Sequence, residues 1–262
     1  MKLYVLGTGH ASVLDCYNTC FILENKDERV LIDAGGGNQI LTQLKKMNID
    51  VNRLESAFIT HNHTDHLLGM IWIIRTVIQG CIKGLRNSTF TLYGSKECLE
   101  AVKTVCIITI GEKYWNSVIN KKLFLKEVKD GQEEKIIGMD FKFFDTKSSE
   151  MSQMAFYIKD KKFVFTGDIP LDESHYQKFK NQKCVCLEAF CLEKYREKNG
   201  FPLKKHNTLE QACDIANILN PEKLILWHKD YYKGVNEEYL QVANKIYDKE
   251  IFVPKDLDVI EL

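Results

Sequence analysis

One short stretch of the sequence holds most of the residues that could bind a metal ion. It reads His61-Asn62-His63-Thr64-Asp65-His66 and contains three of the seven histidines of the chain. Imidazole and carboxylate groups are good ligands for a borderline divalent metal such as zinc. If the stretch begins in an extended conformation, His61 and His63 point the same way, because side chains alternate along a strand. The stretch therefore predicts a metal site, and a polar loop rich in histidine by chance is the weaker interpretation.

The residues that follow predict a helix. They form the apolar run Leu67-Leu68-Gly69-Met70-Ile71-Trp72. Asp65 and His66 would lie on the first turn of this helix and face a second position beside the first pair of histidines. One short loop could therefore hold two metal ions.

Alternating strand-like and helix-like segments surround the stretch. We expect strands at residues 3–6, 19–23, 29–32, 57–60, 90–93, 123–128, 140–144, 155–158, 162–165, 184–187 and 223–226. We expect helices near 40–47, 96–106, 173–179 and 209–219, and a last helix and strand after them. Residues 123–128 and 140–144 flank the turn signal Lys129-Asp130-Gly131 and are predicted to form antiparallel β-structure. No linker interrupts the pattern, which predicts one α/β domain over residues 1–262.

Polar side chains stand at the carboxyl ends of the predicted strands, where ligand sites gather in α/β sheets. They are Asp33, His61, Asp145 with Lys147, Asp168, Glu188 and His228. Some have simpler explanations: Asp33 and Asp168 could be turn residues, and His228 could be a buried core histidine. Six such ends are hard to explain by turn chemistry alone, so we expect them to form one site.

These motifs resemble the metallo-β-lactamase superfamily, and within it the ribonuclease Z branch. The resemblance rests on Leu6-Gly7-Thr8-Gly9, Leu31-Ile32-Asp33-Ala34-Gly35, the histidine stretch, Phe165-Thr166-Gly167-Asp168, Leu187-Glu188-Ala189-Phe190, His206-Asn207-Thr208 and His228. It implies an αββα sandwich, in which two mixed β-sheets are flanked by helices. It also implies one or two Zn²⁺ ions, with Mn²⁺ as the alternative.

The resemblance also implies which residues hold the metal ions. The first ion would bind His61, His63 and Asp168, and the second ion would bind Asp65, His66, Asp168 and His228, so that Asp168 bridges the two. Asp33 would support the site without binding metal directly. His10 and His175 are not expected to be ligands.

A second pair of residues matches the catalytic segments of the ribonuclease Z branch. There a Glu-Ala-Thr segment pairs with a His-Ser-Thr segment, and the histidine assists phosphodiester cleavage; Glu188 and His206 stand at these places. A carboxylate orients an imidazole and raises its pKa, so that the imidazole can protonate a leaving oxygen. Alternatively, His206 merely caps the helix that begins at Thr208.

Two features depart from that branch. Lys147 stands where the third histidine of the first metal is expected, and a protonated ammonium group cannot ligate a cation. The first site is then weak or empty, or Lys147 replaces the charge of the first ion and binds a substrate phosphate or carboxylate. Between the third histidine and the bridging aspartate, the branch inserts a long arm that clamps tRNA. Here residues 155–168 leave room only for a hairpin.

Composition narrows the substrate and the compartment. The formal net charge is zero and the pI is about 7.0, without the basic surface expected of a protein that grips long nucleic acid. The nine cysteines form no Cys-x-x-Cys pair, and no secretory segment precedes the first strand. The longest apolar runs, around 71–74 and 105–110, fall short of a membrane span. We therefore expect a cytoplasmic protein with reduced thiols and no membrane partner, and the family suggests a homodimer.

Together these observations predict a metal-dependent hydrolase that acts on a small phosphorylated or ester substrate. A phosphodiester is the first choice because of Glu188 and His206, with Asp65 orienting the attacking water. Carboxylic esters, lactones and thioesters are the alternatives within the same fold. A catalytically weak protein that binds a ligand or partner through the old site is the alternative from another class, and Lys147 is the feature that favours it.

Overall fold

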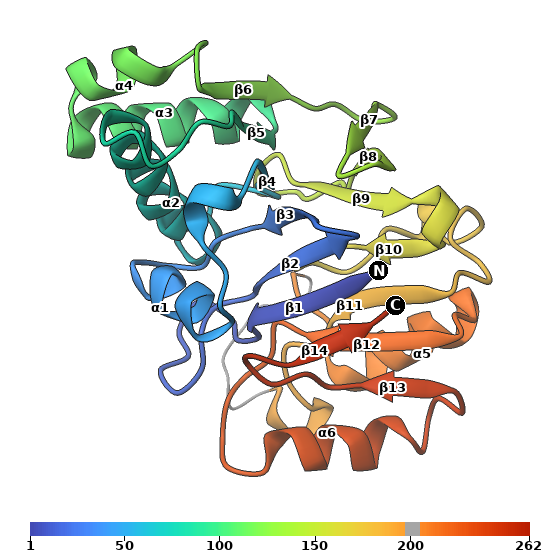
Figure 1. Ribbon diagram of the computed structural model, residues 1–262. Coiled ribbons are helices and arrows are strands. Elements are labelled where there is room, and N and C mark those ends of the chain that lie inside the picture. The colour runs from blue at the N-terminus through green and yellow to red at the C-terminus, as the bar shows by residue number, and fades with distance from the viewer. Residues whose placement is uncertain (197–204) are drawn as a thin grey trace.

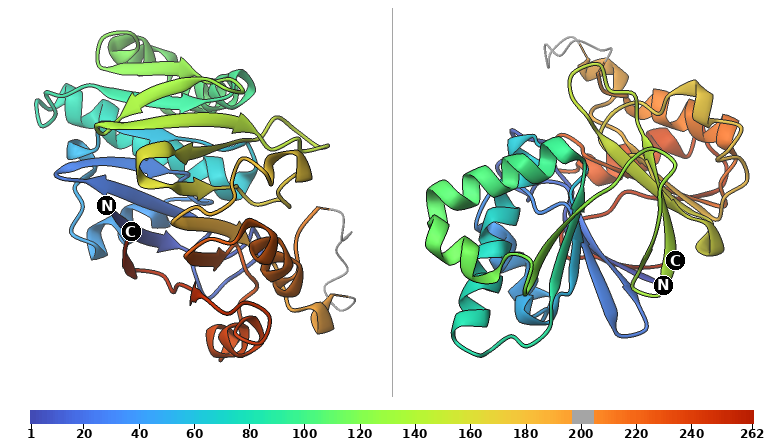
Figure 2. Two further views of the ribbon diagram at one scale, coloured as in Figure 1. Left: turned by 90° about the vertical axis from the view of Figure 1, so that its right-hand side faces the viewer. Right: turned by 90° about the horizontal axis from the view of Figure 1, so that it is seen from above.

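The computed structural model describes residues 1–196 and 205–262. Two β-sheets of seven strands each pack face to face, with helices on both outer surfaces (Figures 1 and 2). The first sheet contains β1 (Lys2–Gly7), β2 (Cys20–Asn25), β3 (Glu28–Ile32), β4 (Ser56–Phe58), β5 (Phe90–Gly94), β6 (Leu123–Glu127) and β14 (Val259–Glu261). The second contains β7 (Glu133–Ile136), β8 (Met139–Asp145), β9 (Met154–Ile158), β10 (Phe163–Phe165), β11 (Cys184–Glu188), β12 (Lys223–Trp227) and β13 (Glu250–Phe252).

Both sheets are mixed. The strand orders are β14-β1-β2-β3-β4-β5-β6 and β13-β12-β11-β10-β9-β8-β7. From β3 to β6 the neighbours are parallel, as they are from β10 to β13, whereas the remaining pairs are antiparallel. The termini lie side by side because β1 pairs with β14 (Figure 1). The predicted αββα sandwich with two mixed sheets is confirmed.

The helices cover the two outer faces. The first sheet carries α1 (Gln39–Lys46), α2 (Thr64–Ile82), α3 (Lys96–Ile110) and α4 (Glu112–Val118), and the second carries α5 (Leu209–Leu219) and α6 (Val235–Ala243). Aromatic side chains fill the layer between the sheets; they include Phe21, Phe58, Phe143, Phe156, Phe165 and Trp227. Aromatic groups bury much apolar area for each residue, so this layer contributes strongly to holding the sheets together.

Two predictions about the middle of the chain are wrong. The segments 123–128 and 140–144 do not pair: β6 runs parallel to β5 in the first sheet, whereas β8 pairs with β7 in the second. The turn at Lys129-Asp130-Gly131 therefore connects the sheets, because strand alternation does not specify a strand's partner. The helix predicted at 173–179 is only the 3-10 turn η3 (Glu173–His175). The sequence predictions also missed α4, β7 and one of the two final strands, β13 and β14.

The helix α2 is longer and more apolar than we expected from the sequence, where we found no run long enough to span a membrane. It is 19 residues long, and by length and composition alone it could cross a membrane. Within its apolar window, however, 61% of the residues are buried inside the protein. A core helix passes the same test, so this is weak evidence for a membrane span. Its first turn carries Asp65 and His66, which places its amino end at the predicted site.

Glycine at position 69 lets α2 approach the loop after β3. The Gly69 amide donates to the Gly35 carbonyl oxygen at 2.7 Å, and the Ala34 amide donates to the His66 carbonyl oxygen at 3.0 Å. A Cβ atom at position 69 would lie 1.7 Å from the Ala34 carbonyl oxygen. The position of His66 therefore depends on a contact that a larger residue would not permit.

We expect the substitution Gly69→Ala to force α2 away from this loop. Overpacking of this kind lowers the free energy of unfolding by about 1–3 kcal/mol, and denaturant unfolding would measure it. Gly37→Ala is the control, because a Cβ at position 37 meets no described atom within 4 Å. Equal stabilities of the two variants would contradict the proposed role of Gly69.

Candidate metal centre

The histidine stretch connects β4 to α2. His63 is extended (φ −62°, ψ 153°) and stands at the N-cap of α2, so Asp65 and His66 lie on the first helical turn as the sequence predicts. His61 and His66 are buried, whereas His63 is exposed. The turn into the helix places these four side chains at one edge of the first sheet, where loops from the second sheet reach them.

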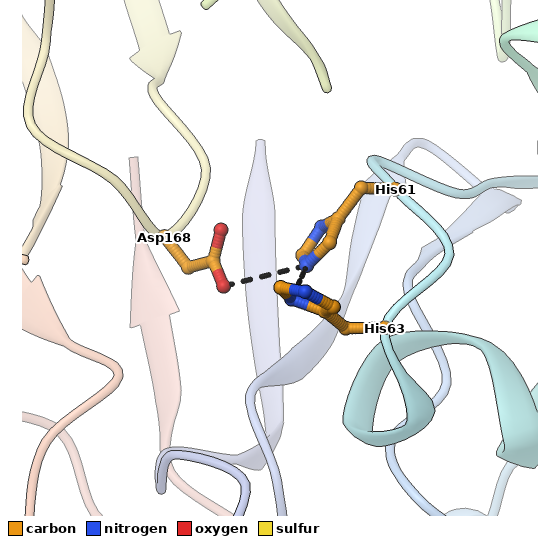
Figure 3. A group of neighbouring side chains, drawn as sticks. All are labelled: His61, His63 and Asp168. Atoms are coloured by element: carbon orange, nitrogen blue, oxygen red, sulfur yellow. Dashed lines mark hydrogen bonds and ion pairs between the residues drawn. The ribbon is translucent and has the colours of Figure 1, made fainter. Parts of the chain in front are cut away.

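The first group of metal-binding side chains contains His61, His63 and Asp168. His61 Nε2 lies 2.9 Å from His63 Nδ1 and 3.5 Å from Asp168 Oδ2 (Figure 3). Asp168 follows β10 in the second sheet, so both sheets contribute to this group. One ligand atom from each residue lies within 4.8 Å of the others, which is compatible with a single bound ion.

The second group contains Asp65, His66 and His228, and it adjoins the first through Asp168. His66 Nε2 lies 3.3 Å from both Asp65 Oδ2 and Asp168 Oδ2. His228 Nε2 lies 3.6 Å from the same Asp168 oxygen. The carboxylate of Asp168 therefore stands between the two groups, as a bridging ligand would.

The chemistry of these donors fits a divalent metal ion. In the described part of the chain, the buried His66 Nε2 makes no hydrogen bond of regular geometry, although two carboxylate oxygens lie 3.3 Å from it. Burial lowers the pKa of His61 to about 4 and that of His228 to about 3, so both imidazoles are neutral and offer a lone pair. Burial would raise the pKa of Asp168, but the charge of the neighbouring His66 helps to hold it well below its usual range. An ionised carboxylate and neutral imidazoles are the ligand forms that a metal requires.

Side chains behind the ligands orient each buried imidazole. His66 Nδ1 lies 2.8 Å from Asp33 Oδ2, so its Nε2 faces the other ligands. Burial would lower the pKa of His66, but Asp65, Asp33 and Asp168 raise it well above its usual value, so a bound metal ion would displace the Nε2 proton. The Thr60 hydroxyl donates to Asp33 and faces His61 Nδ1, both at 2.9 Å. The Thr19 hydroxyl donates to the Gly9 carbonyl and lies 3.2 Å from His228 Nδ1. A hydroxyl that already donates can only accept from the Nδ1–H groups of His61 and His228, which leaves their Nε2 atoms as lone-pair donors.

Asp33 and His228 both adopt left-handed backbone conformations, each with φ 54°. This conformation is uncommon for residues other than glycine and is often found at functional sites. Asp33 also accepts the Thr60 amide at 2.9 Å, so it ties the ends of β3 and β4 together. The structure therefore places Asp33 behind the ligands, where the resemblance predicted a supporting role.

Glu188 and His206 meet beside this centre. His206 Nδ1 lies 2.9 Å from Glu188 Oε2 and 3.0 Å from the Asp168 carbonyl oxygen. The Asn207 amide donates to the other Glu188 oxygen at 2.6 Å. Burial would lower the pKa of His206, but the hydrogen bond and charge of Glu188 raise it to about 9. The helix α5 is capped by Thr208, not by His206, so the capping explanation for His206 is wrong.

Both parts of the site border one cavity. Its volume is about 320 Å³, and its lining includes His63, Asp65, Asp168, His206 and His228. A substrate in this cavity could touch the metal-binding groups and His206 at once. The side chains of His10 and Phe190 also line it, with ring centroids 4.5 Å apart.

Lys147 does not point into this cavity. Its ammonium group donates to Asp172 Oδ1 at 3.1 Å and to Ser174 Oγ at 2.6 Å, and it lines a neighbouring cavity. The prediction that Lys147 binds substrate at the metal centre is therefore not supported by its position. The reason is local: Lys147 is left-handed (φ 61°), and the loop after β10 supplies Asp172 as its partner. The ammonium group thus neither takes a ligand position nor replaces a cation's charge there.

Comparison with known proteins decides the family. A family model described as the anti-Pycsar protein Apyc1 matches residues 1–242. The chain belongs to this family.

Relatives and solved structures agree with the fold. The ribonuclease Z of Thermococcus sibiricus is 27% identical over 307 aligned positions, which cover 100% of this chain and 96% of the relative. The metallo-β-lactamase fold protein YhfI from Bacillus subtilis has a TM-score of 0.78 at 19% identity, covering 99% of this chain and 98% of that one. A diphosphatase from the PhnP family has a TM-score of 0.77 at 17% identity, covering 100% and 97%.

The predicted resemblance is confirmed: the protein is a ribonuclease Z-like, metal-dependent hydrolase of the metallo-β-lactamase superfamily. The structure brings together every predicted site residue except Lys147. Sequence reasoning missed Gln153, which contacts Asp168, and the hydroxyls of Thr19 and Thr60. Only Thr60 had a usable signal, since it directly precedes His61 on a strand that leads into the site.

We expect Asp33→Asn to weaken metal binding by about 10–100-fold, because His66 loses its charged acceptor and its fixed orientation. Zinc content per chain and competition with a chelator would measure this. Asp172→Asn is the control, because Asp172 is a surface carboxylate bonded to Lys147 and Ser174. Unchanged zinc affinity in Asp33→Asn would contradict the supporting role.

Proposed function

We propose that this protein is a metal-dependent phosphodiesterase that acts on a small phosphodiester. The observation that carries the proposal is that the Glu188–His206 pair and the metal-binding groups border the same cavity. Hydrolysis of a phosphodiester needs an attacking water on one side of the phosphorus and a proton for the leaving oxygen. The cavity offers residues suited to both tasks.

Zinc is the metal that we propose, with Mn²⁺ as the alternative. Imidazole nitrogens and carboxylate oxygens are common zinc ligands, and the two groups provide four histidines and two aspartates: His61, His63, Asp65, His66, Asp168 and His228. A bound divalent ion lowers the pKa of water from about 15.7 to about 7 and so supplies hydroxide at neutral pH. The first group offers only three protein ligands, so it could bind its ion weakly. The proposal therefore covers either one or two bound ions.

Asp65 is proposed to orient the attacking water. Burial would raise its pKa, but the neighbouring His66 holds it well below its usual range, so the carboxylate is ionised. An ionised carboxylate accepts a hydrogen bond from water and aims its oxygen at the substrate. Asp65 also borders the cavity, so its carboxylate oxygen could accept a hydrogen bond from an attacking water there.

His206 is proposed to protonate the leaving oxygen. Its pKa of about 9 keeps the imidazole protonated at neutral pH, and its contact with Glu188 fixes the ring. Glu188 is fully buried and accepts a second hydrogen bond from the Asn207 amide, so its position is well determined. Burial raises the pKa of Glu188 to about 7 against the lowering influence of His206. In its ionised form the carboxylate holds the acid in place and stabilises its charge.

Several features support a small substrate. β9 and β10 form an antiparallel hairpin joined by the 3-10 turn η2 (Lys159–Lys161), as the sequence predicts. This short connection takes the place where the ribonuclease Z branch inserts its long tRNA-clamping arm. The cavity volume of about 320 Å³ is at the lower end of the size range of small-molecule sites. The formal net charge is zero, which suits a compact substrate better than a long polyanion.

The test is metal content per chain after purification without chelator, paired with hydrolysis of bis(p-nitrophenyl) phosphate. We expect bound zinc and turnover that is lost on chelation and restored by zinc or manganese. Parallel assays with p-nitrophenyl acetate, a lactone and a thioester separate phosphodiesterase from esterase activity. A metal-loaded protein that cleaves only the carboxylic substrates would refute the phosphodiesterase assignment, and no turnover on any of them would favour a binding protein.

We expect His206→Gln and Glu188→Gln to lower kcat by about 10²–10⁴-fold while zinc content stays the same. In the wild type, kcat should also fall as pH rises through about 9, because the raised pKa keeps the acid protonated only below that value. His206→Gln should remove this limb of the pH profile. His175→Gln is the control, since His175 lies in η3 and bonds the Asp145 carbonyl oxygen away from the cavity. Full activity in His206→Gln would refute the acid role.

A further inference from the structure

The two oxygens of the Asp168 carboxylate have different surroundings. Oδ2 lies 3.5 Å from His61 Nε2, 3.3 Å from His66 Nε2 and 3.6 Å from His228 Nε2. Oδ1 instead accepts a hydrogen bond from the side-chain amide of Gln153. One oxygen therefore faces the imidazoles, and the other is held by a neutral donor.

Gln153 is itself firmly placed. It directly precedes β9 and is 1% exposed. The backbone carbonyl oxygen of Gln153 accepts a hydrogen bond from the Thr146 backbone amide at 3.0 Å and from the Thr146 hydroxyl at 3.1 Å. These bonds close the loop between β8 and β9 and point the amide of Gln153 at the neighbouring strand end.

Gly167 makes room for this contact. Its φ is +82°, and a Cβ atom there would lie 2.8 Å from Gln153 Nε2. The turn that carries Asp168 therefore accommodates the amide at close range. Glycine, which tolerates this φ and has no Cβ, is the residue that such packing requires.

We propose that Gln153 is a positioning residue that fixes the plane of the Asp168 carboxylate, so that Oδ2 is presented to the metal-binding imidazoles. A carboxylate can rotate about its Cβ–Cγ bond and so tilt its plane, and a donor on one oxygen restrains this rotation. Without the amide, Oδ1 would be a buried acceptor with one fewer partner, which is unfavourable. The inference rests on the proposed metal centre and concerns how that centre is held.

The same loop carries Lys147, which stands where the third histidine of the first site was expected. The loop therefore offers the centre no direct ligand through Lys147, but it contributes an indirect hold on Asp168 through Gln153. The first group has only three protein ligands, His61, His63 and Asp168. The orientation of Asp168 should therefore have a large effect on the affinity of that group for a metal ion.

The test uses the full-length protein with Gln153→Met, which keeps the length of the side chain and removes the donor. Gln43→Met is the matched control: Gln43 is also buried and donates to Asp256 Oδ2 at 3.1 Å, and neither residue belongs to the metal-binding groups or lines the cavity. Zinc affinity is measured by competition with a chromophoric chelator, and folding is checked by thermal unfolding. Should Gln153→Met fail to fold, Gln153→Leu, which also lacks the donor and adds no charge, takes its place with the same expected loss of zinc affinity.

We expect Gln153→Met to weaken zinc binding by about 10–100-fold, and Gln43→Met to leave it unchanged. The visible spectrum of the cobalt-loaded protein should also change in Gln153→Met at saturating cobalt, because the ligand geometry changes; general loss of stability would not alter it. Wild-type zinc affinity with an unaltered spectrum in Gln153→Met would overturn the inference, as would an equal loss in both variants. A wild type that binds no zinc would instead refute the metal centre of the proposed function, and the inference with it.

Discussion

Three buried imidazole nitrogens converge on one carboxylate oxygen, and the architecture of the site depends on this crowding. His61, His66 and His228 each place Nε2 within 3.6 Å of Asp168 Oδ2. Burying so many polar atoms together is unfavourable unless they share a partner. A divalent cation is a partner that would satisfy the neutral imidazoles of His61 and His228 and the ionised carboxylate at once.

The two sheets of the sandwich bring these groups close together, because each sheet contributes some of them. The first sheet supplies the histidine stretch and Asp33, whereas the second supplies Asp168, Glu188 and His228 from the ends of β10, β11 and β12. The aromatic layer between the sheets fixes their separation, so a change in that layer would be transmitted to the ligand distances. The distances between ligands from different sheets therefore depend on how tightly the two sheets pack.

Ordinary polar side chains determine how the ligands face. Thr19, Thr60 and Gln153 bind no metal, but they set the ring orientation of His228 and His61 and the carboxylate orientation of Asp168. Lys147 shows the converse, because a charged residue at a predicted ligand position turned to Asp172 instead. Residue type alone does not predict such choices, since threonine, glutamine and lysine are common on every protein surface.

The sequence by itself determined the ligand types, the helix after the histidine stretch and the alternation of strands and helices, because side-chain chemistry and periodicity are local properties. It located Asp168, Glu188, His206 and His228 at strand or helix ends separated by many residues. Only the tertiary structure decided that β6 and β8 belong to different sheets, that Lys147 faces away and that Gln153 holds Asp168. These are contacts between segments distant in the chain, and they follow from how the sheets pack, which no local pattern records.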